Sequence, residues 1–548
     1  MKIYYQGKEV GIPADTARAI DLFKENINVS PKHIIACKCN NEIKSLEYEI
    51  NEGDSVELID ITDKDGIKVY IRGALYIMSM AFNELYPDSR MNVNYQLSNA
   101  MFCQLDNEQV TEEMIKNVKN KMQEIVDKNL PIKKVMMSKE EAEKFYRKEH
   151  TLRGILQVDN KEKNTVSLYF CENYYNYFYG VMPMSTGVVD IFDIQKYKNG
   201  FIVRYPSKED PTKLGEFKES KKFLSVLQEY DDIYSLMQIR TIYNLNKKIE
   251  DGKAKDIILM SEALQEKKIA EMADKITKKK GVKMVLIAGP SSSGKTTFAK
   301  RLGIQLKVNG LKPVTISTDN YFLEREFTPR DEKGDYDFET IDALDLELFN
   351  QHLAKLINGE TIDVPSFDFK VGTKRYNGEK MSLAEDEILV IEGIHCLNDR
   401  LTSSIPSDSK FKIYISDLTV LNVDYFNRIS TTDTRLIRRI VRDYNFRSYS
   451  ALETLKRWPS VNDGEDKNIF PYQEKADAMY NSSLVYELGV LGKYAIPLLK
   501  KIDSSEKEYS EAKRLVSFLE YFEPIEDEKA IPNNSLLREF IGDSVFDY

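Results

Sequence analysis

The chain has 548 residues, of which 42% are hydrophobic and 30% charged, and its net charge is −10. This length exceeds what one hydrophobic core supports, so we expect three or four domains. Acidic and basic residues are interspersed, which argues against a general attraction to nucleic acid. No apolar run reaches the length of a membrane span, and the first residues lack the pattern of a signal peptide. Five cysteines without a disulfide framework favour a cytoplasmic protein.

The first 65 residues alternate short strand patterns with turns. The segments "MKIYYQGKEVGI", "TARAIDLFKEN", "HIIACKCN" and "DSVELIDI" give the order β-β-α-β-β. That order predicts a small mixed sheet crossed by one helix. Cys37 and Cys39 stand near His33, but no second ligand pair follows, so we interpret them as strand residues and not as a metal site.

Helical patterns dominate the middle of the chain. The segment "KVYIRGALYIMSMAFNELYP" predicts an amphipathic helix, "EEMIKNVKNKMQEIVDKN" predicts a second one, and mixed α and β segments continue to about residue 206. Residues 217–280 contain no proline and are rich in Lys, Glu, Leu and Ile, which indicates helices that connect the two halves. The end of the chain, "IPNNSLLREFIGDSVFDY", predicts a turn and then a helix.

From residue 283 onward, apolar strands alternate with helices. The predicted strands are "KMVLIAG", "KPVTIST", "EILVIEGI", "KFKIYIS" and "YAIPLLKKI". This alternation predicts an α/β fold with a parallel sheet that is covered on both faces. Because proline lacks a backbone N–H, Pro497 would place the last strand at an edge or delay its start.

The first of these strands leads into a phosphate-binding loop. Gly289, Gly294, Lys295 and Thr296 have the spacing G-x-x-x-x-G-K-T between a strand and a helix, which is the context that this motif requires. Glycines let successive N–H groups turn toward a polyphosphate, and the helix N-terminus adds its dipole. We expect Lys295 to reach the outer phosphates and Thr296 to bind Mg²⁺. The predicted ATP-binding residues are Gly289, Pro290, Ser291, Ser292, Ser293, Gly294, Lys295, Thr296 and Thr297.

Acids and arginines follow the later strands. Asp319 follows the second strand, and because parallel strands end at the same edge, it should face the loop and either take a proton or orient a metal's water. A role as a helix cap is the alternative. Glu392 ends the third strand, where a second acid near the metal is expected. The segment "TRLIRRIVRDYNFR" is either a solvated helix face or, as we prefer, a mobile lid that clamps the transferred phosphoryl group. Its arginines are Arg435, Arg438, Arg439, Arg442 and Arg447.

Residues 283–505 resemble the uridine kinase family of nucleoside kinases, within the phosphoribulokinase-like group. The resemblance rests on "GPSSSGKTT", "STDNYF", "YDFETIDALD", "VPSFDF", "VIEGIH" and "TRLIRRIVRD". It implies transfer of the γ-phosphoryl group of ATP, with Mg²⁺, to the 5′-hydroxyl of a ribonucleoside. The catalytic residues that it implies are Asp319, Lys295, Arg439 and Arg442, and the implied metal ligands are Thr296, Asp319 and Glu392.

The resemblance also implies a nucleoside site, although this site departs from the family pattern. Glu339 stands where the family has an aspartate that holds the ribose hydroxyls. The family's base-side tyrosine is Phe367, its histidine falls at Gly372, and a lid arginine falls at Tyr449. Because replaced hydrogen-bond donors change which base a site accepts, the base preference stays open, purines included. The expected substrate-binding residues are Glu339, Phe367, Phe369, Arg447 and Tyr449.

The front half, residues 1–206, resembles parts of other proteins. Residues 1–62, with "IIACKCNNEI" and "INEGDSVELIDITDKDG", are similar to a TGS domain, a β-grasp module. Residues 63–206, with "LYIMSMAFNELYP" and "MPMSTGVVDIFDI", resemble the editing-type α+β second domain of threonyl-tRNA synthetase. The positions of that family's metal or hydrolytic ligands hold Arg72, Tyr76, Phe178 and Met182. The resemblance therefore implies the fold without the hydrolysis.

The expected organisation is a TGS-like domain (1–62), an editing-like domain (63–206), a helical connector (207–280), a kinase domain (281–505) and a helical tail (506–548). The leading hypothesis is an ATP- and Mg²⁺-dependent nucleoside kinase. Two alternatives stay open: an RNA- or tRNA-associated protein that uses the loop as a nucleotide switch, and a P-loop kinase for another small acceptor. The expected partners are a nucleoside, RNA or a small-molecule effector at the front half, and a second copy of the chain, but no membrane.

Overall fold

The computed structural model describes residues 2–5, 7–13, 18–22, 34–106, 108–148, 165–330, 334–368 and 371–548. Much of the helix predicted around residues 16–26 lies outside these ranges, as does His33. Within them, no helix is both long enough and apolar enough to cross a membrane.

The chain begins with the predicted small mixed sheet. Its strands are β1 (Lys2–Tyr5), β2 (Lys8–Gly11), β3 (Ile34–Cys39), β4 (Glu42–Lys44) and β5 (Ser55–Asp60), with a short helical turn, η1 (Ala19–Leu22). The strand order is β2-β1-β5-β3-β4, in which β1 and β5 run parallel. Cys37 and Cys39 are buried in β3, and burial raises the pKa of each thiol to about 12. They are therefore core residues, as predicted.

The second region packs two helices against antiparallel strands. The helices are α2 (Lys64–Leu85) and α3 (Glu112–Asp127), which form as predicted. One sheet has the order β11-β12-β7-β6 and the other β10-β9-β8. Their strands are β6 (Met91–Gln96), β7 (Ala100–Leu105), β8 (Lys133–Ser138), β9 (Thr165–Cys171), β10 (Tyr174–Asn176), β11 (Asp193–Tyr197) and β12 (Gly200–Arg204), with α4 (Lys139–Lys148) and η2 (Thr186–Val188) between them.

The four positions aligned with the synthetase ligands lie close together in this region. The rings of Tyr76 and Phe178 are 5.8 Å apart between centroids, and both share a buried core with Met182. Arg72, one helical turn before Tyr76, donates its Nε–H to the carbonyl of Val181 at 2.8 Å. At these four positions the chain therefore has packed aromatic and apolar side chains and one guanidinium group, which are not metal ligands.

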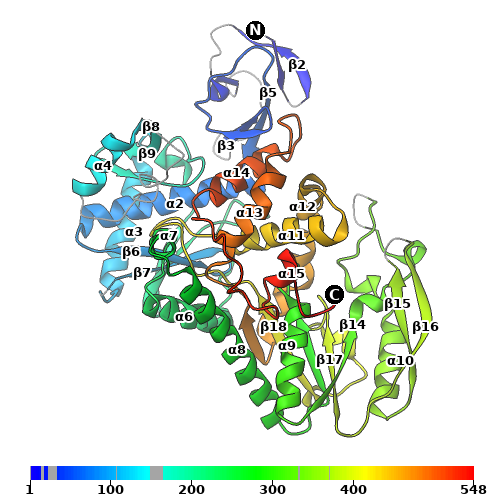
Figure 1. Cartoon of the computed structure of the whole chain (residues 1–548). Coiled ribbons are helices and arrows are strands. Elements are labelled where there is room, and N and C mark those ends of the chain that lie inside the picture. Colours follow the sequence, from blue (N-terminus) through cyan, green and yellow to red (C-terminus); the bar gives the residue numbers. More distant parts are fainter. Residues whose placement is uncertain are drawn as a thin grey trace.

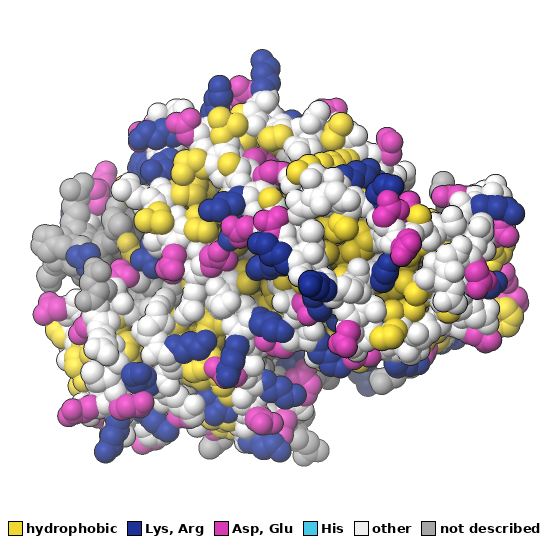
Figure 2. Space-filling model, turned by 90° about the horizontal axis from the view of Figure 1, so that it is seen from below, with side chains coloured by type: hydrophobic (Ala, Val, Ile, Leu, Met, Phe, Trp, Pro, Cys, Tyr) yellow, Lys and Arg dark blue, Asp and Glu magenta, His cyan; other side chains and the backbone are white. Residues whose placement is uncertain are grey.

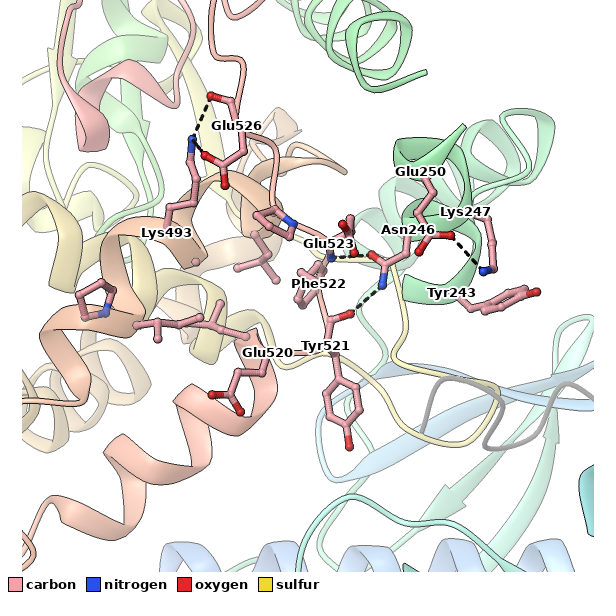
Figure 3. A pocket seen from close by; sticks show the side chains of 17 residues that line it. Tyr243, Asn246, Lys247, Glu250, Lys493, Glu520, Tyr521, Phe522, Glu523 and Glu526 are labelled. Carbon is pink, nitrogen blue, oxygen red and sulfur yellow. Dashed lines mark hydrogen bonds and ion pairs between the residues drawn. The ribbon is translucent and has the colours of Figure 1, made fainter. Parts of the chain in front are cut away.

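Three helices connect the halves, as predicted: α6 (Lys221–Leu236), α7 (Ile242–Glu250) and α8 (Ala254–Lys278). Figure 3 shows a pocket beside α7, with a volume of about 420 Å³. There Asn246 donates to the carbonyl of Tyr521 at 2.7 Å and accepts from the N–H of Glu523 at 2.9 Å. The charged Lys493 pairs with Glu526 at the rim. The contacts of Asn246 fasten the end of the chain to the connector.

A five-stranded sheet, parallel throughout, forms the core of the C-terminal part. Its order is β14-β17-β13-β18-β19. The strands are β13 (Met284–Ala288), β14 (Lys312–Ser317), β17 (Glu387–Glu392), β18 (Lys410–Ser416) and β19 (Ala478–Asn481). Val285 and Ile287 of β13 face a core with α8 and α9 (Lys295–Val308), whereas Met284 and Leu286 face a core with α10 (Leu346–Ile357). The sheet is covered on both faces, as predicted.

The fifth predicted strand is wrong. The segment "YAIPLLKKI" belongs mainly to a helix, α13 (Glu487–Leu499), with Pro497 near its end, and β19 takes the edge of the sheet instead. Three helices pack against α13: α11 (Thr431–Arg447), α12 (Ala451–Asn468) and α14 (Tyr509–Leu519). Because such a helix is buried on most sides, its sequence is apolar all round and resembles that of a buried strand.

Two further features were not predicted. A hairpin of β15 (Ile362–Asp368) and β16 (Thr373–Met381) stands at one side of the sheet (Figure 1). The expected helical tail is helical only in α14 and α15 (Arg538–Ile541), and the rest consists of turns and irregular segments. The remaining short turns are η3 (Thr318–Tyr321), η4 (Arg325–Phe327), η5 (Ile341–Ala343), η6 (Asp399–Thr402), η7 (Ser407–Ser409) and η8 (Phe470–Lys475).

The two ends of the chain also meet. The N-terminal sheet lies beside α14 in Figure 1, and there Glu42 pairs with Lys513 at 2.7 Å. The N–H of Ile43 donates to Ser510 Oγ at 3.2 Å. The first sheet is thus attached directly to the C-terminal helices.

Candidate active site

The loop between β13 and α9 has the geometry that its glycines predict. A Cβ on Gly289 would lie 1.9 Å from the carbonyl oxygen of Ile415, so only glycine lets β13 approach β18 this closely. Gly294 has φ +81°, a backbone conformation that glycine adopts without strain. The hydroxyls of Ser292 and Ser293 are buried and have no hydrogen-bond partner in the described part of the chain. They are polar groups that a phosphate would satisfy.

Buried ion pairs hold this loop from behind. Arg435, 2% exposed, forms two hydrogen bonds with Glu465 at 2.6 and 2.8 Å, and Glu465 accepts the N–H of Ser291 at 2.8 Å. Arg438, fully buried, pairs with Glu487 at 2.6 Å and donates to the carbonyl of Ser292 at 3.3 Å. These two arginines therefore fix the loop, and their assignment to a mobile lid is wrong.

The two acids at the strand ends share the crevice with the loop. Ser317 and Glu392 face each other in register, and Glu392 accepts hydrogen bonds from Ser317 and from Thr296 Oγ, each at 3.5 Å. Burial and then the charge of Asp319 raise the pKa of Glu392 to about 7. The carboxyl group of Asp319 reaches solvent, but the protein packed around it raises its pKa, whereas Lys295 lowers it.

Glu339 lies within electrostatic range of the same lysine, Lys295. Its burial raises its pKa to about 7, while the charges of Arg439 and Lys295 lower it. A Cβ on Gly464 of α12 would come within 2.4 Å of Glu339 Cβ, so this glycine makes room for the acid. The structure thus brings Lys295, Asp319, Glu339 and Glu392 together.

The remaining arginines of α11 share one carboxylate, Asp443. This residue is buried and accepts hydrogen bonds from Arg439 at 3.2 Å and from Arg442 at 2.8 and 3.0 Å, and Arg447 lies 3.8 Å away. Arg439 also donates to Ser291 Oγ at 2.9 Å. Asp443 therefore orients the cations beside the loop. The sequence reasoning missed it, although one acid among so many arginines was a usable signal.

Aromatic residues form the wall next to Asp319. Phe322 lies 5.7 Å from Phe367 of β15 and 5.9 Å from Phe338, between ring centroids. Gly372 has φ +81°, and a Cβ there would lie 2.7 Å from the Nε of Arg325. The side chain of Arg325 therefore fills the space beside Gly372.

Phe369 lies outside the described residues. Tyr449, another expected substrate residue, is not part of this wall. Tyr449 lies just before the start of α12. The guanidinium carbon of Arg457 stands over the ring of Tyr449, 4.2 Å from the ring centroid. Within the described part of the chain, no hydrogen bond or ring contact joins Tyr449 to the four clustered charges.

The end of the chain contacts the phosphate-binding loop and the first turn of α9, which the sequence did not indicate. A Cβ on Gly294 would meet Leu536 at 2.4 Å. Glu539 accepts a hydrogen bond from the hydroxyl of Thr297, which also lies 2.8 Å from the hydroxyl of Tyr548. The residues in contact are more than two hundred positions apart in the sequence, so no local sequence pattern predicts this contact.

The donor set fits a nucleoside triphosphate and a divalent cation. Lys295 donates to the carbonyl of Pro290 at 3.1 Å within its own loop, so its charge is available to phosphate. The carboxyl groups of Asp319 and Glu392 and the hydroxyl of Thr296 are hard oxygen ligands of the kind that Mg²⁺ prefers. Burial and then the negative charge of Asp319 raise the pKa of Glu392, and a bound cation would favour the ionised form of both carboxyl groups.

The outer surface gives less support to a nucleic-acid site. Figure 2 shows one face of the molecule, where Lys and Arg side chains are intermingled with Asp and Glu. A continuous basic stripe is the usual footprint of nucleic-acid binding, and this face does not carry one.

Comparison with known proteins finds different relatives for the two halves of the chain. The sequence model of the phosphoribulokinase / uridine kinase family matches residues 284–485. The uridine kinase of Mycoplasma genitalium is 30% identical over 182 residues, which cover 33% of this chain and 76% of that protein. A solved structure described as a "Possible Uridine Kinase" from Bacillus stearothermophilus is 18% identical and covers 39% of this chain and 97% of that one, with a TM-score of 0.27, too low to establish a shared fold.

The N-terminal half is similar to threonine–tRNA ligases. The probable cytoplasmic threonine–tRNA ligase of Enterocytozoon bieneusi is 30% identical over 166 residues, which cover 30% of this chain. The chain spans only 26% of the length of that relative.

Proposed function

The chain belongs to the phosphoribulokinase / uridine kinase family, and from this premise we propose that it transfers the γ-phosphoryl group of ATP to the 5′-hydroxyl of a ribonucleoside. The observation that carries the proposal is the proximity of Lys295 to Asp319, Glu339 and Glu392, since its charge lowers the pKa of each of these carboxyl groups. A phosphate-binding cation, a base for the hydroxyl and an acid for the ribose are the groups that this reaction needs.

In the proposed mechanism each residue has one task. Lys295 and the loop N–H groups other than that of Ser291, which Glu465 holds, bind the phosphates. Thr296, Asp319 and Glu392 would hold Mg²⁺, which neutralises charge on the phosphate oxygens when bound. Glu339 accepts hydrogen bonds from the ribose hydroxyls. Asp319 takes the proton of the 5′-hydroxyl as its oxygen bonds to the γ-phosphorus and the bond to the bridging oxygen of ADP breaks.

Arg439 and Arg442 stabilise the charge of the transferred group, positioned by their shared carboxylate partner, Asp443. The wall of Phe322, Phe338 and Phe367 would stack on the base. Because the space beside Gly372 holds the cationic side chain of Arg325, we expect a base with an acceptor edge at that position.

The test is ATP turnover by the purified chain against uridine, cytidine, adenosine and guanosine, with pantothenate and a sugar phosphate as rival acceptors. We expect a nucleoside 5′-monophosphate, identified by chromatography against standards. Turnover with a rival acceptor and with no nucleoside would instead support a P-loop kinase of another specificity.

A further inference from the structure

A larger cavity lies between the front half and the C-terminal helices. Its volume is about 920 Å³, and its walls come from α2, residues 177–181, residues 423–430, α12 and α14. The cavity is within the volume range of small-molecule sites and is shared by both halves of the chain.

One wall of this cavity is cationic. Lys64, Lys68 and Arg72 follow one another at intervals of four residues, so they form a stripe along one face of α2 that lines the cavity. Arg428 lines it from the loop before α11. Arg514 also lines it, but its guanidinium group already binds two carboxylates, Asp433 and Glu511.

Arg72 and Arg428 lack such compensation. Among the described residues neither guanidinium group has a carboxylate within ion-pair distance, and the Nε of Arg428 is buried without a hydrogen-bond partner. Burial lowers the pKa of Arg72 to about 10 and also lowers that of Arg428. Neither guanidinium group has a carboxylate partner in the described part of the chain, although Arg72 donates its Nε–H to the carbonyl of Val181 at 2.8 Å. Guanidinium groups without a carboxylate, beside a cavity that they line, are donors that a phosphate binds.

Largely buried aromatic side chains form other parts of the lining. Phe178, Phe426, Trp458 and Phe518 line the cavity, each from a different element. Aromatic side chains next to guanidinium groups suit a ligand that carries both a planar ring and a charged group.

The cavity is joined to the P-loop through α11 and α12. The ring of Trp458 in the cavity wall lies 5.5 Å from the guanidinium carbon of Arg435 and 5.9 Å from that of Arg439. Both arginines donate to Ser291 of the loop, at 3.2 and 2.9 Å. A ligand that contacts Trp458 is therefore connected to the phosphate-binding loop through Trp458 and one arginine, either Arg435 or Arg439.

From these contacts we propose that the cavity is an effector site for a ribonucleoside monophosphate, whose phosphate binds Arg72 and Arg428 and whose base packs against the aromatic part of the lining. Occupancy changes ATP turnover through Trp458, Arg435 and Arg439. The binding part of this inference does not depend on the acceptor of the kinase.

The chain offers a direct probe, because Trp458 is its one tryptophan. UMP and AMP are titrated against its fluorescence in the presence of saturating ADP and Mg²⁺, with uridine, adenosine and inorganic phosphate for comparison. The stoichiometry is measured by equilibrium dialysis. We expect a saturable signal from a monophosphate, weaker binding of the matching nucleoside and of phosphate alone, and a Kd raised at least tenfold by Arg72→Gln and by Arg428→Gln.

The matched control is Lys116→Gln, which removes an exposed charge on α3 and should leave the Kd unchanged. Arg72→Lys keeps the charge but not the two parallel donors of the guanidinium group, so it should raise the Kd of the monophosphate by an intermediate amount. The Kd of ATP should not change in any of these variants. The proposal is overturned if neither monophosphate binds at millimolar concentration. It is equally overturned if both glutamine variants bind as the parent does, or if the variants lose binding of an RNA oligonucleotide while no monophosphate binds.

Discussion

The hydroxyl of Thr297 donates to the carboxylate of Glu539 at 2.6 Å, and the backbone N–H of Thr297 lies 3.4 Å from the same oxygen. Thr297 is in the first turn of α9, where N–H groups bind anions. The carboxylate therefore competes with a phosphate for this position. We expect Glu539→Gln to lower the Kd of ATP by about two- to fivefold, since a charge at a helix N-terminus contributes roughly 0.3–1 kcal/mol. Isothermal titration calorimetry measures the change.

Glu526→Gln is the matched control, because Glu526 lies in the same tail and its side chain is 78% exposed. An unchanged or higher Kd of ATP in Glu539→Gln would mean that Glu539 only anchors the tail.

Asp319 is the proposed base, and its removal tests the reaction directly. We expect Asp319→Asn to lower kcat at least about 100-fold, the usual contribution of a positioned base, while the Kd of ATP stays within about threefold. Steady-state kinetics and calorimetry give the two values. Asp342→Asn is the control, because Asp342 is exposed and pairs with Arg400. Turnover within tenfold of the parent would remove Asp319 from the mechanism.

The raised pKa of Glu339, about 7, predicts a pH dependence of nucleoside binding. Below this pH the carboxyl group is protonated and loses acceptor capacity, so the KM for the nucleoside should fall as the pH rises from about 6 to 8. Glu339→Gln has no such titration, so its KM should be higher at pH 8 and should vary less with pH. An identical pH profile in both proteins would show that another group titrates.

The raised pKa of Glu392 predicts how the stability of the folded chain depends on pH. Its pKa rises from 4.5 to about 7 in the folded chain without a cation, so folding favours the protonated form. The ionised carboxylate therefore destabilises the fold fully above about pH 7, and this effect is lost as the pH falls toward 4.5. We expect Glu392→Gln to raise the Tm of the nucleotide-free protein by about 2 °C at pH 8, with a smaller effect at pH 5, as read by differential scanning fluorimetry. A lower Tm at pH 8 would contradict this account.

Local sequence patterns predicted the elements whose structure depends mainly on neighbouring residues. The strand before Gly289, the loop and the helix after Gly294 follow from spacing and from glycine chemistry, and the parallel sheet places Glu392 beside Ser317 without further information. The helix α13 was mistaken for a strand because its burial on most sides removes the helical period. The hairpin of β15 and β16 escaped notice because most of β16 is solvent-exposed and polar.

Contacts between distant segments could not be predicted from one sequence. The return of Glu539 and Tyr548 to Thr297 depends on how the whole tail packs. The burial of Arg435 and Arg438 depends on Glu465 and Glu487, which come from two other helices. A dense run of arginines has the same sequence pattern whether its side chains face solvent or pair with a buried acid, so the pattern alone cannot distinguish the two.

The pairing of Arg435 with Glu465 has a consequence for the thermodynamics of nucleotide binding. Because Glu465 already immobilises the N–H of Ser291, the phosphate-binding loop is preorganised before any ligand arrives. Association with ATP therefore avoids much of the entropic cost of ordering a flexible loop. The amide of Ser291 should exchange its hydrogen slowly even in the free protein, and it should lose that protection only when α12 unfolds.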